Sequence, residues 1–438
     1  MMRKKFPIFA GILIICGLAV FVIVRATSKH APPQAELSQS LTNYTGPVTP
    51  GDRLIIAAQR SVERDPSHAA GYNLLTAAFM QKARETGDFS FNAKAEDALN
   101  HAFKVAPDDY DALKLRAKLL LTYHRFADAL ETARRAQAVN PRDHDVYGAM
   151  TDALVELGDY AGAVEAAQMM VDLRPDTASY SRISYLRSLH GDNKGAIEAM
   201  RLAVQAANPQ DPESVAWCRV HLGDELLSAG QSAEAEREYD HALFLFPDYH
   251  LALAAKARAR LAAGDANGAI AFYTRAVERV PLPDYASALG DIYHKLGRKD
   301  EAQKQYALVE FVEKTGAMDG TYSRQLALFW ADHDMRLDDA LAAAERERAA
   351  RKDIYTCDAL AWCLYKKGQL TEAQTAMDEA LRLGTKDPRL LYHAGMLAHA
   401  RGDEHKAANF LKQAFAINPS FDVLQSDVAR RTLATIKA

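Results

Sequence analysis

Cysteine and long apolar runs are both scarce in this sequence of 438 residues. The chain has four cysteines, which are too few for a disulfide scaffold. Only residues 6–24 continue without a charge or a strongly polar side chain over a membrane-spanning length, so a polytopic membrane protein is excluded. Disorder throughout is excluded as well, because 49% hydrophobic and 25% charged residues are ordinary values for a globular protein.

Clustered positive charge is missing from the body of the chain. Residues 1–30 hold five Lys or Arg and no acidic residue, which leaves 48 basic and 57 acidic residues, a net charge of −9, for the rest. A partner with a phosphate backbone would need a clustered basic surface. We therefore expect no nucleic-acid partner.

Motifs for catalysis and for metal binding are also missing. The sequence has no GxxxxGKS or GxxxxGKT phosphate loop, no HExxH, no GxSxG and no CxxC pair with metal spacing. Cys357 and Cys363 lie six residues apart, about 600° around a helix, and do not share a face. His393, His399 and His405 have the same spacing, which spreads them around one helix and into the next. We therefore expect no metal, no cofactor, no small-molecule substrate and no catalysis, while an enzyme with an unrecognised site stays an alternative.

Residues 6–24 predict a membrane segment that follows a short basic tail, residues 1–5. As a helix, this segment would be about 28 Å long, close to the hydrocarbon thickness of a bilayer. We favour an uncleaved signal anchor, because the run exceeds the apolar core of a cleaved signal and the best cleavage site contains Arg25. The charges before the run place the tail in the cytoplasm and the body outside, in a periplasmic or other extracytoplasmic space. A cleaved signal on a secreted or periplasmic soluble protein is the alternative.

The remaining chain divides into three predicted parts. Residues 25–50 predict a linker, because four prolines stand there among Ser, Thr, Gln and Ala without an apolar period. Residues 51–420 hold a repeated helical pattern. Residues 421–438 predict a closing helix, in which one apolar stripe is formed by Val423, Leu424, Val428 and Leu433.

A period of 34 residues runs through residues 51–420. Prolines and glycines recur with this period. Successive members of the series Pro107, Pro141, Pro175 and Pro209 are 34 residues apart, as are Gly230 and Gly264, and Gly368 and Gly402. Between these marks the apolar period is helical and rich in Ala and Leu, without the alternation typical of strands. The 388 residues from position 51 onward leave room for ten repeats, a leading helix and a closing helix.

One unit shows the physical logic of the repeat. Gly230 ends its first helix, because glycine readily takes the left-handed conformation found at a helix C-terminus. Gly223, Ala235 and Ala242 stand where the two helices must approach closely, and Tyr239 fills the space between neighbouring pairs. In four units an Asp after the terminal Gly is well placed to cap the second helix: Asp159, Asp192, Asp265 and Asp403.

This pattern resembles the tetratricopeptide repeat, a helix-turn-helix unit of about 34 residues. The resemblance is strong where Leu289, Gly290, Gly297 and Tyr306 stand, and weaker in two units, in which His124 and Asp334 replace the terminal Gly. It implies an all-α solenoid of about ten such repeats, wound into a right-handed superhelix and preceded by one transmembrane or signal helix. The first helices of such a solenoid line a concave groove.

The function implied by the resemblance is non-catalytic. Members of the family mostly bind a segment of a partner protein in the groove. Together with residues 6–24, this implies a membrane-tethered scaffold. The alternative is an exported soluble repeat protein with a cleaved signal that acts in envelope assembly.

Aromatic residues on two neighbouring first helices are the leading candidates for the groove. Trp362 and Tyr365 are three residues apart, and Tyr392 and Met396 are four apart, so each pair shares a helix face. We expect a solvent-accessible patch, because such side chains carry binding energy at interfaces. Core packing between repeats is the alternative. The full candidate set is Tyr355, Trp362, Tyr365, Tyr392, Met396 and His399.

Arg182, Tyr185 and Trp217 form a second candidate cluster, in which an Arg beside aromatic rings could stack on a ligand. An internal polar contact between repeats is the alternative.

Acidic residues on first helices suggest an acidic inner wall across the middle of the solenoid. Dispersed solubilising charge is the alternative. The residues concerned are Asp145, Asp152, Asp224, Asp284 and Asp291.

Overall fold

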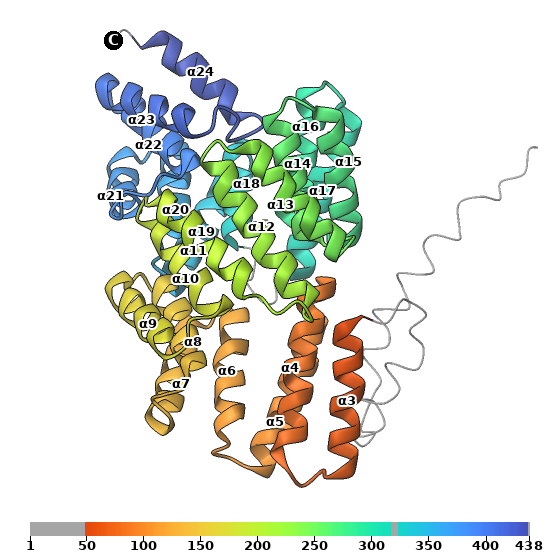
Figure 1. Ribbon diagram of the computed structural model, residues 1–438. Coiled ribbons are helices and arrows are strands. Elements are labelled where there is room, and N and C mark those ends of the chain that lie inside the picture. The colour runs from red at the N-terminus through yellow and green to blue at the C-terminus, as the bar shows by residue number, and fades with distance from the viewer. Residues whose placement is uncertain (1–48, 317–322, 437–438) are drawn as a thin grey trace, which may run out of the picture. The chain divides into compact units, whose positions relative to one another are not determined.

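The computed structural model describes residues 49–316 and 323–436, and all regular structure within these ranges is helical (Figure 1). Residues 50–438 form one compact unit. The predicted tail, membrane segment and most of the linker lie outside the described residues. Within the described ranges, no helix is both long enough and apolar enough to cross a membrane.

The described chain has 22 helices, labelled α3 to α24 in Figure 1: ten hairpin pairs between a leading helix and a closing helix. The leading helix is α3 (Pro50–Arg64), and the closing helix is α24 (Gln425–Thr435). The first helices of the pairs are α4 (Ala69–Thr86), α6 (Tyr110–Thr122), α8 (His144–Glu156), α10 (Thr177–Leu189), α12 (Pro212–Ser228), α14 (His250–Ala262), α16 (Pro283–Lys295), α18 (Ser323–Asp332), α20 (Ile354–Lys366) and α22 (Pro388–Ala400). The second helices are α5 (Ser90–Val105), α7 (Phe126–Val139), α9 (Tyr160–Leu173), α11 (Asn193–Ala206), α13 (Ser232–Leu245), α15 (Ala266–Arg279), α17 (Lys299–Gly316), α19 (Leu337–Ala350), α21 (Leu370–Ala380) and α23 (Glu404–Ile417).

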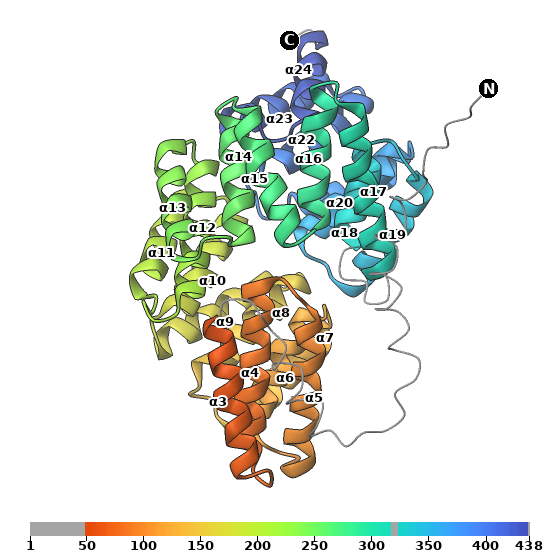
Figure 2. The same cartoon turned by 90° about the vertical axis from the view of Figure 1, so that its right-hand side faces the viewer.

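The two helices of each pair pack most closely on each other, and contacts with neighbouring helices outside the pair come next. In Figure 2 the pairs from α12 and α13 to α18 and α19 follow one another across the view. The predicted all-α solenoid of about ten helix-turn-helix units is therefore confirmed.

The turn inside each pair contains a residue with a positive φ, and the turn between α18 and α19 contains two, Asp334 and Arg336. Gly264 takes this position between α14 and α15, with a φ of 78°. His124 and Asp334, which replace the terminal Gly in two units, have φ values of 55° and 53°. The predicted Asp caps are also present, since each of these side chains accepts a hydrogen bond from a backbone N–H in the first turn of the second helix: Asp159, Asp192, Asp265 and Asp403.

Small residues allow the two helices of a pair to touch, as the sequence predicted. A Cβ on Gly223 would overlap the ring of Tyr239, which is fully buried and donates a hydrogen bond from its hydroxyl to Asp224 at 2.9 Å. A Cβ on Gly290 would lie 2.5 Å from Cε1 of Tyr306. In both units the glycine of the first helix accommodates a tyrosine of the second.

The solenoid also makes contacts between units far apart in the sequence, which nearest-neighbour stacking alone does not produce. The turn that follows α8 meets the segment that leads into α20. There the Lys352 N–H donates to the Glu156 carbonyl at 2.7 Å, and the Ile354 N–H donates to the Tyr160 hydroxyl at 2.9 Å. Arg351 adds a bond from Nη1 to Oε2 of Glu156 at 3.1 Å. A further contact lies one unit on: an added Cβ on Gly191, after α10, would lie 2.5 Å from the carbonyl oxygen of Gly384, in the segment between α21 and α22. We call all of these contacts together the closure.

A second long-range contact joins α16 to the C-terminal end of the solenoid. Lys295, the last residue of α16, donates from Nζ to the Val423 carbonyl at 2.9 Å and pairs with Asp427 of α24 at 2.8 Å. The segment that connects α23 to α24 is therefore held against the first helix of a unit more than a hundred residues earlier.

Candidate functional site

A cavity of about 600 Å³ lies among the first helices of the C-terminal half of the solenoid. Six first helices contribute to its wall: α12, α14, α16, α18, α20 and α22. Residues 418–425, which join α23 to α24, complete it, together with Tyr273 of α15. First helices that line a hollow are what the resemblance to the tetratricopeptide repeat implies.

The wall of the cavity carries more acidic than basic side chains. It holds seven aspartates, three arginines and one histidine, a net charge of −4 when the histidine is neutral. The acidic residues are Asp224, Asp284, Asp291, Asp332, Asp358, Asp387 and Asp422, and the others are Arg258, Arg324, Arg389 and His333.

Each arginine of the wall is paired with a carboxylate. Arg258 contacts Asp224 at 2.7 Å, and Arg389 contacts Asp332. Arg324 contacts Asp353, which is not one of the seven aspartates of the wall, at 3.2 Å. The wall thus offers no unpaired guanidinium group among the described residues.

Two further aspartates of the wall are paired with imidazole rings. Asp291 lies 2.8 Å from Nε2 of His333 and accepts a hydrogen bond from the Tyr306 hydroxyl at 2.8 Å. Asp358 lies 2.9 Å from Nδ1 of His393, a fully buried ring on α22. These carboxylates are held in place by groups of their own chain.

Three aspartates of the wall lack a cation in hydrogen-bond contact within the described ranges. Asp387 and Asp422 accept hydrogen bonds only from backbone N–H groups of their own turns. The carboxylate of Asp284, in the first turn of α16, has neither a hydrogen bond nor an ion pair to any described residue. The surrounding protein raises the pKa of the Asp284 and Asp387 carboxyls, because desolvation disfavours their charged forms.

The tetratricopeptide repeat family model matches this chain over residues 115–178, 149–212, 221–286, 255–317 and 359–420, which together make up more than half of it. The chain belongs to the tetratricopeptide repeat family. Proteins built from these repeats generally bind other proteins, so this tetratricopeptide repeat protein is a protein-interaction scaffold in the general sense.

Individual relatives are distant. The protein FlbA of Caulobacter vibrioides is 26% identical over 142 residues, which are 32% of this chain and 23% of FlbA. This chain therefore matches about a quarter of that protein's length. The yeast Tom70 structure is 14% identical, with coverage of 92% of this chain and 95% of that chain and a TM-score of 0.39. A human IFIT1 dimer structure is 10% identical, with coverage of 86% and 97% and a TM-score of 0.46.

The predicted solvent-accessible aromatic patch is wrong. Trp362 and Tyr392 are each 1% exposed, and Met396 is 8% exposed. Neighbouring first helices pack directly on one another here, so these side chains fill the core together with Trp330 of α18. Trp362 donates from Nε1 to Asp332 at 2.8 Å, and Tyr392 donates from its hydroxyl to Gln425 at 2.8 Å.

The other three members of that set lie elsewhere. Tyr365 is half-buried and stacks on Trp362 with ring centres 4.8 Å apart. His399 lies 2.9 Å from Oε2 of Glu404. Only Tyr355, which is half-buried, lines the cavity.

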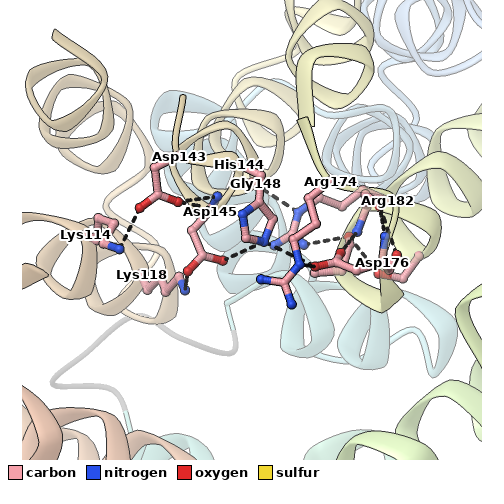
Figure 3. Close-up of polar contacts among 12 residues, drawn as sticks. Lys114, Lys118, Asp143, His144, Asp145, Gly148, Arg174, Asp176 and Arg182 are labelled. Carbon is pink, nitrogen blue, oxygen red and sulfur yellow. Dashed lines mark hydrogen bonds and ion pairs between the residues drawn. The ribbon is translucent and has the colours of Figure 1, made fainter. Parts of the chain in front are cut away.

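Arg182, Tyr185 and Trp217 do not form one cluster. Arg182 binds Asp152 through two hydrogen bonds, at 2.8 and 2.6 Å, and also donates to the Gly148 carbonyl (Figure 3). Tyr185 is 43% exposed, while the Trp217 ring packs against His221. In the described structure no ring or cation–π contact joins the three, and Arg182 makes the internal polar contact that was the alternative.

The acidic inner wall is confined to the C-terminal half. Asp145 is neutralised by Lys118 at 3.4 Å, and Asp152 is neutralised by Arg182, so the prediction is wrong for these two residues. Figure 3 shows Asp145 and Arg182 among neighbouring acidic and basic side chains of this part of the solenoid. The prediction is correct for the three that line the cavity: Asp224, Asp284 and Asp291.

Sequence reasoning missed four aspartates and all three arginines of the wall. Asp387 could have been found, because it stands just before Pro388, where an Asp commonly caps a first helix. No capping pattern in the sequence marks Asp332, Asp358 or Asp422, which come together at the cavity only through the packing of the units.

Proposed function

We propose that this tetratricopeptide repeat protein is a non-catalytic scaffold that binds a segment of a partner protein in the cavity. The single observation that carries the proposal is a cavity of about 600 Å³ to which six successive first helices contribute. This volume is in the range of sites that enclose a ligand, roughly 300–1,000 Å³.

The side chains of the wall support binding rather than bond making. Most of its titratable groups are held in pairs, such as Asp224 with Arg258 and Asp291 with His333. Half-buried rings, Tyr355 and Phe421, offer flat surfaces for side chains of an extended segment. Aromatic residues of this kind dominate binding energy at protein interfaces.

We further propose that residues 6–24 tether the scaffold to a membrane, with the repeats on the extracytoplasmic side. The proposal is supported by the length of the apolar run and by the basic tail that precedes it. An uncleaved anchor keeps the full chain in the membrane fraction through washing with high salt and with carbonate. A soluble mature chain that begins near Thr27, identified by N-terminal sequencing, would show instead that the signal is removed.

The binding proposal is tested by filling the cavity. Ser287 of α16 lines it, and its hydroxyl makes no hydrogen bond in the described structure, so Ser287→Trp places a large ring in the space with little loss of native contacts. Ser232→Trp, at the exposed start of α13, adds the same ring outside the cavity. Circular dichroism establishes that both variants keep the helical content of the wild type.

The readout is quantitative affinity capture with the full-length chain and both variants. Proteins that bind in the cavity are retained by the wild type and by Ser232→Trp and are lost from Ser287→Trp. Equal retention by all three chains contradicts the cavity as the binding site.

A further inference from the structure

We infer that the cavity takes a cationic stretch of the partner, an extended segment that carries Lys or Arg side chains. The inference rests on the proposed function and specifies the chemistry of the partner. It follows from the charges of the wall, from their pairing and from the contrast with the other half of the solenoid.

The pairing inside the wall leaves negative charge uncompensated. All three arginines are occupied by carboxylates, whereas Asp284, Asp387 and Asp422 have no cation within hydrogen-bond distance in the described ranges. An anionic segment would be repelled by this excess of negative charge and would find no unpaired guanidinium group on the wall. A Lys or Arg side chain, in contrast, would supply the missing counter-charge to carboxylates that the solvent can reach, as at the exposed Asp284.

Asp284 is the most favourable of the three for an incoming cation. Asp387 and Asp422 already accept backbone N–H groups, which partly satisfy their oxygen atoms. The carboxylate of Asp284 accepts no hydrogen bond from the described chain, and Asp284 lines the cavity from the first turn of α16. Both of its oxygen atoms are therefore free for a bidentate contact with a guanidinium group, or for one bond to an ammonium group.

The N-terminal half of the solenoid does not offer the same surface. Along α6, α8 and α10 each carboxylate is matched by a nearby cation, as in Lys114 with Asp143 at 2.7 Å and Lys118 with Asp145 at 3.4 Å (Figure 3). Charge complementarity therefore directs a cationic segment to the cavity rather than to the first helices before it.

The wall also has flat rings for the apolar parts of such side chains. Tyr355 and Phe421 line the cavity and are only half-buried. Cations bind the faces of aromatic rings, and Arg does so more often than Lys. Carboxylates next to accessible rings are suited to a segment in which basic residues alternate with small or apolar ones.

The test uses a random dodecapeptide library, displayed on phage and selected against the full-length chain. Individual peptides are then synthesised, and their affinities are measured by fluorescence anisotropy for the wild type, for Asp284→Asn and for Asp300→Asn. Asp300 is the matched control, because it is exposed and stands in the first turn of another helix, α17. Both substitutions remove one carboxylate from the start of a helix and change the net charge equally.

The inference predicts peptides enriched in Lys and Arg. Their affinity falls at least about tenfold in Asp284→Asn, falls further in Asp284→Lys, and stays within about twofold in Asp300→Asn. Cationic peptides that bind Asp284→Asn as tightly as the wild type would overturn the inference, because their attraction would then be to the net charge of the chain.

Failure of the inference can be told apart from failure of the proposed function with Ser287→Trp. If the selected peptides are neutral or acidic and bind the wild type but not Ser287→Trp, the cavity binds peptides of a different chemistry, and only the inference fails. A library that yields no binder sensitive to Ser287→Trp contradicts both.

Discussion

The closure contacts make a quantitative prediction for Gly191→Ala. Gly191 ends α10 with a φ of 72°, and a Cβ there would lie 2.5 Å from the carbonyl oxygen of Gly384, in the segment between α21 and α22. A backbone oxygen cannot rotate away as the end of a flexible side chain can. Gly264 is the matched control, because it has nearly the same φ, 78°, but nothing within 4 Å of the added Cβ.

The expected cost follows from two contributions. A left-handed conformation costs an Ala about 1–2 kcal/mol at both positions, offset by about 0.4–1 kcal/mol from the lower entropy of the unfolded chain. The overlap with the Gly384 carbonyl adds about 1–3 kcal/mol at position 191 only. We therefore expect Gly264→Ala to lower the free energy of unfolding by about 1 kcal/mol and Gly191→Ala by about 2–4 kcal/mol.

Urea denaturation followed by circular dichroism gives the difference in stability, and hydrogen exchange shows where it arises. The Ile354 amide is the direct reporter, because it donates to the Tyr160 hydroxyl across the closure. It should exchange faster in Gly191→Ala and at the wild-type rate in Gly264→Ala. Equal stabilities of the two variants, with unchanged exchange at Ile354, would refute the closure.

Three further predictions concern single residues. Burial raises the pKa of Glu225 to about 7, whereas the pKa in the unfolded chain is near 4.5, so the free energy of unfolding falls as the pH rises between these values. Denaturation at each pH should therefore show Glu225→Gln to be more stable than the wild type by about 1–2 kcal/mol at pH 8 and equal to it at pH 4. Trp362→Ala should lower the free energy of unfolding by about 3–5 kcal/mol, because the ring is fully buried. A decrease of less than about 1 kcal/mol would contradict its place in the core. Gly290→Val should cost about 3–5 kcal/mol, since it displaces Tyr306 and its hydrogen bond to Asp291, and stability within about 0.5 kcal/mol of the wild type would mean that the assigned register is wrong.

The repeat architecture could be predicted from the sequence because it depends on local geometry. A terminal Gly marks a backbone position with positive φ, and a 34-residue period fixes that position in every unit. The same register identified His124 and Asp334 as replacements, and both take the left-handed conformation. Asp caps follow from the same local logic, since each cap bonds within its own turn.

The fate of the aromatic residues could not be predicted in the same way. Spacing of three or four residues shows that Trp362 and Tyr365 share a helix face, but not whether that face meets solvent or the neighbouring first helix. The structure resolves this, since Trp362 packs with Trp330 one unit earlier and Tyr392 one unit later. The helix face that the repeat pattern assigns to the groove is thus buried in the contact between neighbouring units.

The closure and the wall of the cavity lie beyond sequence reasoning for a different reason. The contact between Glu156 and Lys352 joins residues 196 positions apart, and no periodic signal links them. The same holds for Asp422, which lines the cavity from the segment after α23, a segment that contacts α16 through Lys295 and α18 through Gln425. Asp224, Asp284 and Asp291 were predicted because the 34-residue register places them at expected groove positions of their first helices.

The central claim, that the cavity receives a partner segment, is tested most directly by site-specific photo-crosslinking in the full-length chain. A benzophenone side chain replaces Ser287 inside the cavity or, as the control, Ser232 outside it. The account predicts a partner adduct from position 287 that maps to a segment rich in Lys and Arg, and no matching adduct from position 232. Adducts of equal yield from both positions, or none from position 287, would contradict it.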